Sequence, residues 1–169
     1  MERQREITLR FLAEPTDVNF GGNVHGGAVM KWIDQAGYTC AAGWTGTYCV
    51  TVYVGGLHFL APIRVGELVE LRALVIRTGR TSLDIAVDVY ARDPRSGTPR
   101  RTGHCVIVFV ALDVEGRPIA VPPWQPETEV DLALETYAAH LADLRRQMDL
   151  EMERRLAAEA EAAQPAADV

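Results

Sequence analysis

The stretch DVNFGGNVHGG, from Asp17 to Gly27, leads directly into AVMKWIDQAGYTCAAG, residues 28–43, and this junction decides the fold. The first part is rich in glycine and asparagine, so it predicts an irregular loop. In the second part, apolar residues recur at three- and four-residue steps, as in Val29, Ile33, Ala36 and Cys40. This period predicts a helix over about residues 26–43. Its many small residues indicate a helix that is packed closely on several sides.

The rest of the domain is predicted to form β-strands. A short extended segment is expected near residues 7–12. It is followed, after the helix, by TYCVTVYVGGLHFL (47–60), ELVELRALVIRTG (67–79), TSLDIAVDVYARD (81–93) and RRTGHCVIVFVALD (100–113). The Gly55-Gly56 pair predicts a bulge, and the short polar connections predict that the last three strands are consecutive and antiparallel. A long helix followed by a meander of strands predicts an α+β fold, in which an antiparallel sheet wraps the helix.

Length and composition indicate a single globular domain. The chain has 169 residues, of which 48% are hydrophobic and 24% charged, values typical of one folded unit with one core. We expect this domain to cover residues 1–124. Residues 125–169 are expected to form a helical extension, because they favour helix by propensity and charge pattern, and the final QPAADV is expected to be disordered.

Charge and cysteine content exclude several classes of protein. A net charge of -6 argues against nucleic acid as a partner, since phosphates are bound through clustered lysine and arginine. The N-terminus has charges where a signal peptide needs an apolar core, and no run approaches a membrane span, so we expect a cytoplasmic protein without a membrane partner. The three cysteines, Cys40, Cys49 and Cys105, have neither CxxC nor metal-ligand spacing, which predicts reduced thiols and no metal site.

Asp34 is the candidate catalytic residue. It lies in the apolar context WIDQA, where a carboxylate is costly unless it is paired or used, although an ordinary solvent-facing aspartate explains the spacing equally well. The loop that precedes it enters the helix N-terminus, where free backbone N–H groups can polarise a carbonyl oxygen. An aspartate is ordinarily ionised at neutral pH and can therefore act on such a carbonyl.

Four motifs in order carry a family resemblance: NxxGNVHGGxxMKxID (19–34), VTVYVGGLHFLAPIRVGELVEL (50–71), TGRTSLDIAVDVY (78–90) and VFVALDVEGRPIAVP (108–122). Together they resemble the YciA-like and brain-type acyl-CoA thioesterases of the hot-dog superfamily, over roughly residues 5–122. The chain departs from many YciA-like sequences at Gly55, where they carry an acidic residue. The resemblance implies a hot-dog fold, acyl-CoA hydrolysis without a cofactor, and a homo-oligomer built from dimers, with a trimer of dimers as the larger assembly.

The resemblance also implies roles for individual residues. Asp34 would act on the thioester carbonyl as nucleophile or as general base, and Asn19 would orient water or substrate across a dimer interface. The backbone N–H of Gly26, with Gly27 beside it, would polarise the carbonyl. His25 adjoins the substrate position, but its place before the helix N-terminus favours a role in shaping the loop over a role as base. For Asn19, an Asx-type turn is the alternative.

A second segment matches the family's contact with coenzyme A. Gly79, Arg80, Thr81 and Ser82 would contact the pantetheine and the phosphates through backbone N–H groups, hydroxyls and the guanidinium. The alternative is a hairpin turn with an exposed arginine.

Two other functions fit the same fold. A non-catalytic acyl-CoA binding or sensing protein would keep the groove without turnover, but the presence of Asn19, Gly26 and Asp34 speaks against it. A dehydratase or hydratase would pair a histidine with an acid, and the nine positions between His25 and Asp34 are poor spacing for that pairing on one helix face.

Overall fold

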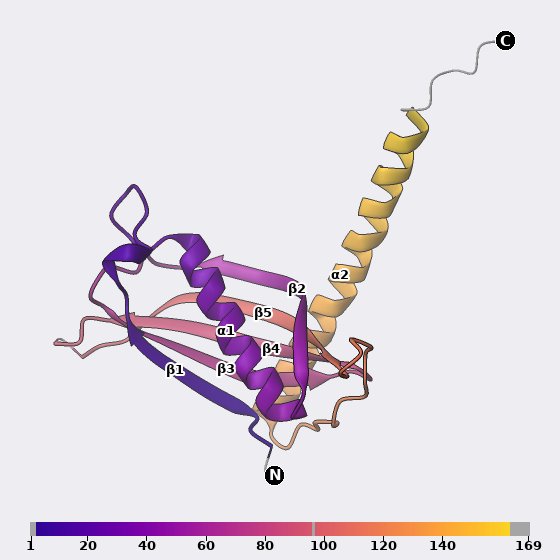
Figure 1. Cartoon of the computed structure of the whole chain (residues 1–169), viewed down its shortest axis with the longest axis horizontal. Helices are drawn as coiled ribbons and strands as arrows, with labels where there is room; N and C mark the ends of the chain where they lie inside the picture. Colours follow the sequence, from indigo (N-terminus) through magenta and orange to yellow (C-terminus); the bar gives the residue numbers. More distant parts are fainter. Residues whose placement is uncertain (1–2, 96, 163–169) are drawn as a thin grey trace.

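The structure is a computed structural model that describes residues 3–95 and 97–162 (Figure 1). Its elements, in chain order, are β1 (Glu6–Leu12), a 3₁₀ turn η1 (Pro15–Asp17), α1 (Gly26–Thr45), β2 (Tyr48–Phe59), β3 (Leu68–Thr78), β4 (Ser82–Arg92), β5 (Arg100–Leu112) and α2 (Glu129–Ala162). The strands form one antiparallel sheet in the order β1-β3-β4-β5-β2. The predicted α+β architecture is confirmed.

Helix α1 lies across one face of this sheet, and its apolar side forms the core with β1, β3, β4 and β5 (Figure 1). Val29, Ile33, Ala36 and Cys40 are all buried, as their spacing predicts. Gly37 lies where the helix comes closest to the sheet. A Cβ atom at that position would lie 2.8 Å from the Phe109 ring and 2.9 Å from an Ile107 methyl, so only glycine fits without a shift.

Helix α1 extends two residues beyond its predicted end. Gly43 does not end it; the helix continues to Thr45 and is capped by Gly46, whose φ of 72° is left-handed and whose N–H donates to the Ala42 carbonyl. A glycine in the helix interior lowers stability without breaking the helix, whereas the left-handed position after the last turn favours glycine.

Strand β2 forms one edge of the sheet and, among the described residues, pairs with β5 alone. It has register shifts between Thr51 and Tyr53 and between Gly55 and His58, which confirms the irregularity predicted at the glycine pair. Several of its apolar side chains are exposed, among them Val52, Val54 and Phe59. A long apolar edge strand of this kind is normally covered by another chain or segment.

Helix α2 lies on the sheet face opposite α1, and its packing on the sheet runs as far as Arg145, whose guanidinium lies over the Tyr53 ring of β2. Ala138 packs against Ile76, Ala86 and Val106, and the helix then continues away from the body (Figure 1). Among the described residues, no helix is both long enough and apolar enough to cross a membrane.

Candidate active site

The loop before α1 is held by its own side chains. Asn19 Oδ1 accepts hydrogen bonds from the N–H groups of Gly21 (2.8 Å) and Asn23 (3.3 Å), so Asn19 forms an Asx-type turn. The described hydrogen bonds of the Asn19 side chain use only its oxygen. The loop tip carries Phe20, whose side chain is fully exposed.

His25 is the N-cap of α1. Its Nδ1 accepts a hydrogen bond from the Gly27 N–H at 2.8 Å, and its own N–H donates to the Asp17 carbonyl at 2.6 Å. The imidazole therefore shapes the junction of loop and helix. Because His25 occupies the N–H of Gly27, that group is not free to bind a carbonyl oxygen in this conformation.

Gly26 offers the open backbone donor. Within residues 3–95 and 97–162, its N–H makes no hydrogen bond, as expected for the first turn of a helix. Gly26 lines a cavity of about 430 Å³ together with Asn19, and Phe59 and Leu60 from the end of β2 form part of its apolar wall. The loop asparagine and the helix N-terminus thus face one space.

Asp34 lies further along α1, on the side that faces away from the core. Its neighbours Trp32 and Ile33 are buried, whereas Asp34 itself is exposed. The Thr51 hydroxyl of β2 donates a hydrogen bond to Asp34 Oδ1 at 2.5 Å. An ionised carboxylate only accepts hydrogen bonds, so this contact holds one oxygen and leaves the other for a reacting group.

Thr51 was not identified from the sequence. It lies seventeen positions after Asp34, and nothing in that spacing indicates contact, because a helix, a turn and the start of a strand intervene. Only the pairing of β2 with β5, which fixes where the strand crosses α1, brings the two side chains together.

Asp34 and Gly26 do not share a cavity within one chain. Asp34 is eight residues after Gly26, roughly 12 Å along the helix, and it does not line the cavity that contains Asn19 and Gly26. Asp34 and Gly26 therefore lie at two separate places on α1.

The turn between β3 and β4 lies at the same end of the sheet as Thr51. The Gly79 N–H donates to the Ser82 carbonyl at 2.8 Å, which closes the predicted hairpin. The carbonyls of Arg80 and Thr81 accept from Val121 and Ala111, so the turn is anchored to the segment after β5 and to β5 itself. The Arg80 side chain is exposed.

The cysteines lie outside the site. All three are free and buried, and burial raises the pKa of the Cys40 and Cys105 thiols to about 12, which disfavours the reactive thiolate. No group of three histidine, cysteine, aspartate or glutamate side chains in the described part of the chain is arranged to hold a metal ion.

Residues 21–98 match the model of the thioesterase superfamily. The chain is 34% identical to the acyl-CoA thioester hydrolase YciA of Escherichia coli over 122 residues, which cover 70% of this chain and 92% of that protein. Protein VdlD of Helicobacter pylori is 30% identical over 127 residues, 75% of this chain and 72% of the relative.

Solved structures show the same fold. An acyl-CoA hydrolase from Staphylococcus aureus, in complex with butyryl coenzyme A and coenzyme A, superposes with a TM-score of 0.84 at 25% identity, over 93% of this chain and 96% of that chain. A hexameric thioesterase from Yersinia pestis gives a TM-score of 0.65 at 36% identity, over 69% of this chain and 94% of that chain.

Three variants of the Staphylococcus aureus hydrolase have also been solved, in which one asparagine, one aspartate and one threonine are each replaced by alanine. In that protein's numbering, the asparagine lies fifteen positions before the aspartate and the threonine seventeen positions after it. Asn19, Asp34 and Thr51 have the same spacing. With its five-stranded antiparallel sheet around a central helix and these relatives, the chain is an enzyme of the hot-dog fold and belongs to the thioesterase superfamily.

Proposed function

We propose that this enzyme hydrolyses acyl-CoA thioesters at a site that two copies of the chain build together. The observation that carries the proposal is the hydrogen bond from Thr51 to Asp34 on the exposed side of α1, away from the cavity of Asn19 and Gly26. Asp34 is held in this way but has no carbonyl-binding group beside it in its own chain. A second chain would therefore supply that group.

The second chain would meet the first at β2. This edge strand carries Thr51 and exposes apolar side chains, and pairing it with its counterpart in a two-fold arrangement covers both edges. In such a pair, the carboxylate of Asp34 in one copy would face the loop asparagine and the Gly26 N–H of the other. The hexameric relatives are consistent with a dimer as the unit of a larger assembly.

The reaction needs only these groups. The Gly26 N–H would bind the thioester oxygen and stabilise the charge that develops on it. Asp34 would act in one of two ways: its free oxygen attacks the carbonyl carbon and forms a mixed anhydride that water then hydrolyses, or it takes a proton from a water that attacks the carbonyl. In both routes the C–S bond breaks, the thiolate of coenzyme A leaves and is protonated, and the acyl group is released as a carboxylate.

The turn from Gly79 to Ser82 would bind the coenzyme A part of the substrate. Support comes from its place at the same end of the sheet as Thr51 and from the exposed guanidinium of Arg80. Because the N–H of Gly79 closes the turn, the contacts would come from Arg80 and the hydroxyls of Thr81 and Ser82.

Replacing Asn19 tests whether its side-chain amide has a catalytic role in addition to forming the turn. Asn19→Asp keeps the oxygen that binds the loop N–H groups but removes the NH₂ donor, whereas Asn19→Ala removes both. We expect both variants to lower kcat by about tenfold, since the donor would position water or substrate, and only Asn19→Ala to lower the thermal midpoint. A wild-type rate for Asn19→Asp would show that Asn19 shapes the loop and has no catalytic role.

Replacing Thr51 tests the contact with Asp34. Thr51→Val keeps the β-branched shape that suits a strand but removes the hydroxyl, and we expect kcat to fall by about tenfold because the carboxylate loses the donor that orients it. Thr51→Ser, which keeps the hydroxyl, should retain most of the activity. Equal rates for the two variants in a thiol-release assay would show that the hydrogen bond has no catalytic role.

The function itself is tested by thiol release from acyl-CoA substrates of short, medium and long chain, with the wild-type enzyme and Asp34→Ala side by side. Turnover by the wild type that is lost in the variant supports the proposal and ranks the substrates. Tight acyl-CoA binding by both proteins with no turnover by either would instead indicate a sensing protein.

A further inference from the structure

The cavity beside Gly26 has a polar side and an apolar side. Asn19 and Asn23 of the loop line the polar side, whereas the wall formed by residues 59–63 is apolar. The cavity measures about 430 Å³, roughly three times an apolar cavity of about 150 Å³ that holds benzene. It is therefore large enough for an aliphatic chain as well as for the carbonyl that the Gly26 N–H would bind.

The floor of this cavity is buried and apolar. Exposed fractions do not exceed 7% at the residues that form it, Val24, Val29, Ile63 and Thr102. Thr102 is the polar member of this set, and its hydroxyl donates a hydrogen bond to the Val89 carbonyl at 3.1 Å. The floor side chains therefore have no free donor to offer a ligand, and they favour an alkyl group.

The Phe59 ring lies beside the N-terminus of α1. A Cβ atom at Gly26 would lie 3.5 Å from the tip of this ring, so the ring is within van der Waals reach of the residue whose N–H would bind the thioester oxygen. Phe59 is the last residue of β2, and its exposed fraction is 55%. Its ring therefore forms the cavity wall on the β2 side without being held in the core.

The two parts of the substrate are directed to opposite ends of the sheet. The turn proposed above for coenzyme A lies at the end that holds Thr51. The Gly26 cavity lies at the other end, where Phe59 pairs with Gly103. With the carbonyl at the Gly26 N–H of one copy and the coenzyme A part on the turn of the second copy, the cavity remains for the acyl chain.

The chemistry of the floor favours the acyl chain over pantetheine. Pantetheine carries amide groups, and burying an amide without a hydrogen-bond partner is costly. A saturated chain has no such groups, and each methylene that it buries strengthens binding by about fourfold. The apolar floor therefore matches the acyl part of the substrate.

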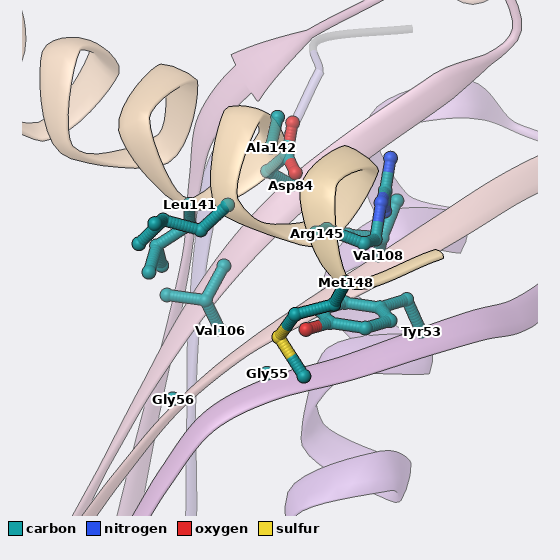
Figure 2. A pocket seen from close by; sticks show the side chains of 11 residues that line it. Tyr53, Gly55, Gly56, Asp84, Val106, Val108, Leu141, Ala142, Arg145 and Met148 are labelled. Carbon is teal, nitrogen blue, oxygen red and sulfur yellow. The ribbon is translucent and has the colours of Figure 1, made fainter. Parts of the chain in front are cut away.

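A second cavity, under α2, does not compete for this chain (Figure 2). It measures about 150 Å³, and its lining includes Tyr53, Val106, Leu141 and Met148. It lies between the sheet and α2, on the face opposite α1 (Figure 1). A chain whose carbonyl is bound at Gly26 cannot reach it without passing through the sheet.

We propose that the Gly26 cavity takes the acyl chain and that the Phe59 ring sets the longest chain that it accepts. The inference rests on the proposed function. The Gly26 N–H holds the carbonyl at the mouth of the cavity, the first carbons of the chain pack along the Phe59 ring, and the buried floor stops the chain. Carbons beyond this limit gain nothing from burial, so the cavity wall determines which acyl-CoAs are preferred.

The test is the profile of kcat/KM against chain length for saturated acyl-CoAs from butanoyl to hexadecanoyl. For the wild type we expect a rise of about fourfold per methylene up to a limit, and no further rise beyond it. Phe59→Ala should move this limit to longer chains, and kcat/KM for a chain just beyond the wild-type limit should rise by about tenfold or more. Ala61→Phe, which adds a ring to the same wall, should move the limit to shorter chains.

Met148→Ala is the matched control, because it truncates an apolar residue that lines the second cavity. Its profile should be that of the wild type. Equal profiles for Phe59→Ala and Met148→Ala, or a wild-type profile without a limit, would overturn the inference. The thermal midpoint of each variant checks that it is folded.

Binding separates failure of this inference from failure of the proposed function. Calorimetric titration of the same acyl-CoAs into Asp34→Asn, with and without Phe59→Ala, measures the affinity limit independently of turnover, and the limit should move in the same direction. Hydrolysis by the wild type with an unchanged affinity limit would leave the function and overturn the role of Phe59. No hydrolysis by the wild type, but an affinity limit that moves with Phe59→Ala, would overturn the function and leave the cavity as the acyl site.

Discussion

Replacing Asp34 by asparagine is expected to lower kcat for acyl-CoA hydrolysis by about a thousandfold or more, because the amide neither attacks a carbonyl nor takes a proton from water. The amide oxygen still accepts the hydrogen bond that Thr51 donates, and the side chain is exposed, so the fold should be unaffected. The measurement is thiol release under saturating substrate, with the thermal midpoint of each protein as a check of folding.

Gln35→Ala provides the matched control, since Gln35 is also exposed and adjacent on α1. It should retain most of the wild-type rate. Near-normal turnover by Asp34→Asn would show that the catalytic group lies elsewhere. Hydroxylamine added during turnover tests the nucleophilic role of Asp34: a hydroxamate on its carboxyl group indicates a mixed anhydride.

Replacing Gly37 by alanine is expected to reduce the free energy of unfolding by about 1–2 kcal/mol. The added methyl would meet the Phe109 ring at 2.8 Å and the Ile107 methyl at 2.9 Å, and overpacking of this kind costs about 1–3 kcal/mol. The gain in helix propensity, about 0.5–1 kcal/mol, offsets only part of this cost. Chemical denaturation measures the change.

Gly43→Ala on the same helix should have the opposite sign. A Cβ at Gly43 meets nothing nearer than 3.6 Å, so only the propensity gain of about 0.5–1 kcal/mol remains. If both substitutions stabilised the protein, the close contact of α1 with β5 would not be what requires glycine at position 37.

Local sequence patterns determined the elements, and the resemblance of four motifs to a known family supplied most of the candidate residues. The three- and four-residue steps from Val29 to Cys40 predicted a helix with one buried side, and the β-branched runs predicted the strands. Both signals are local, because a residue's side of a helix or strand depends only on its spacing from its neighbours. The same holds for the turn at Asn19 and for the helix N-terminus at Gly26, since a loop asparagine and an open first turn are properties of a few adjacent residues.

Tertiary structure decided which of these residues meet. The contact of Thr51 with Asp34 depends on how β2 crosses α1. The separation of Asp34 from the cavity that Gly26 lines depends on the direction in which each side of the helix faces. The path of α2 is a third case: propensity predicted a helix, but only packing shows that it crosses the outer face of the sheet. Such contacts join residues far apart in the chain, and their geometry is determined by the packing of the whole sheet, so no local pattern encodes them.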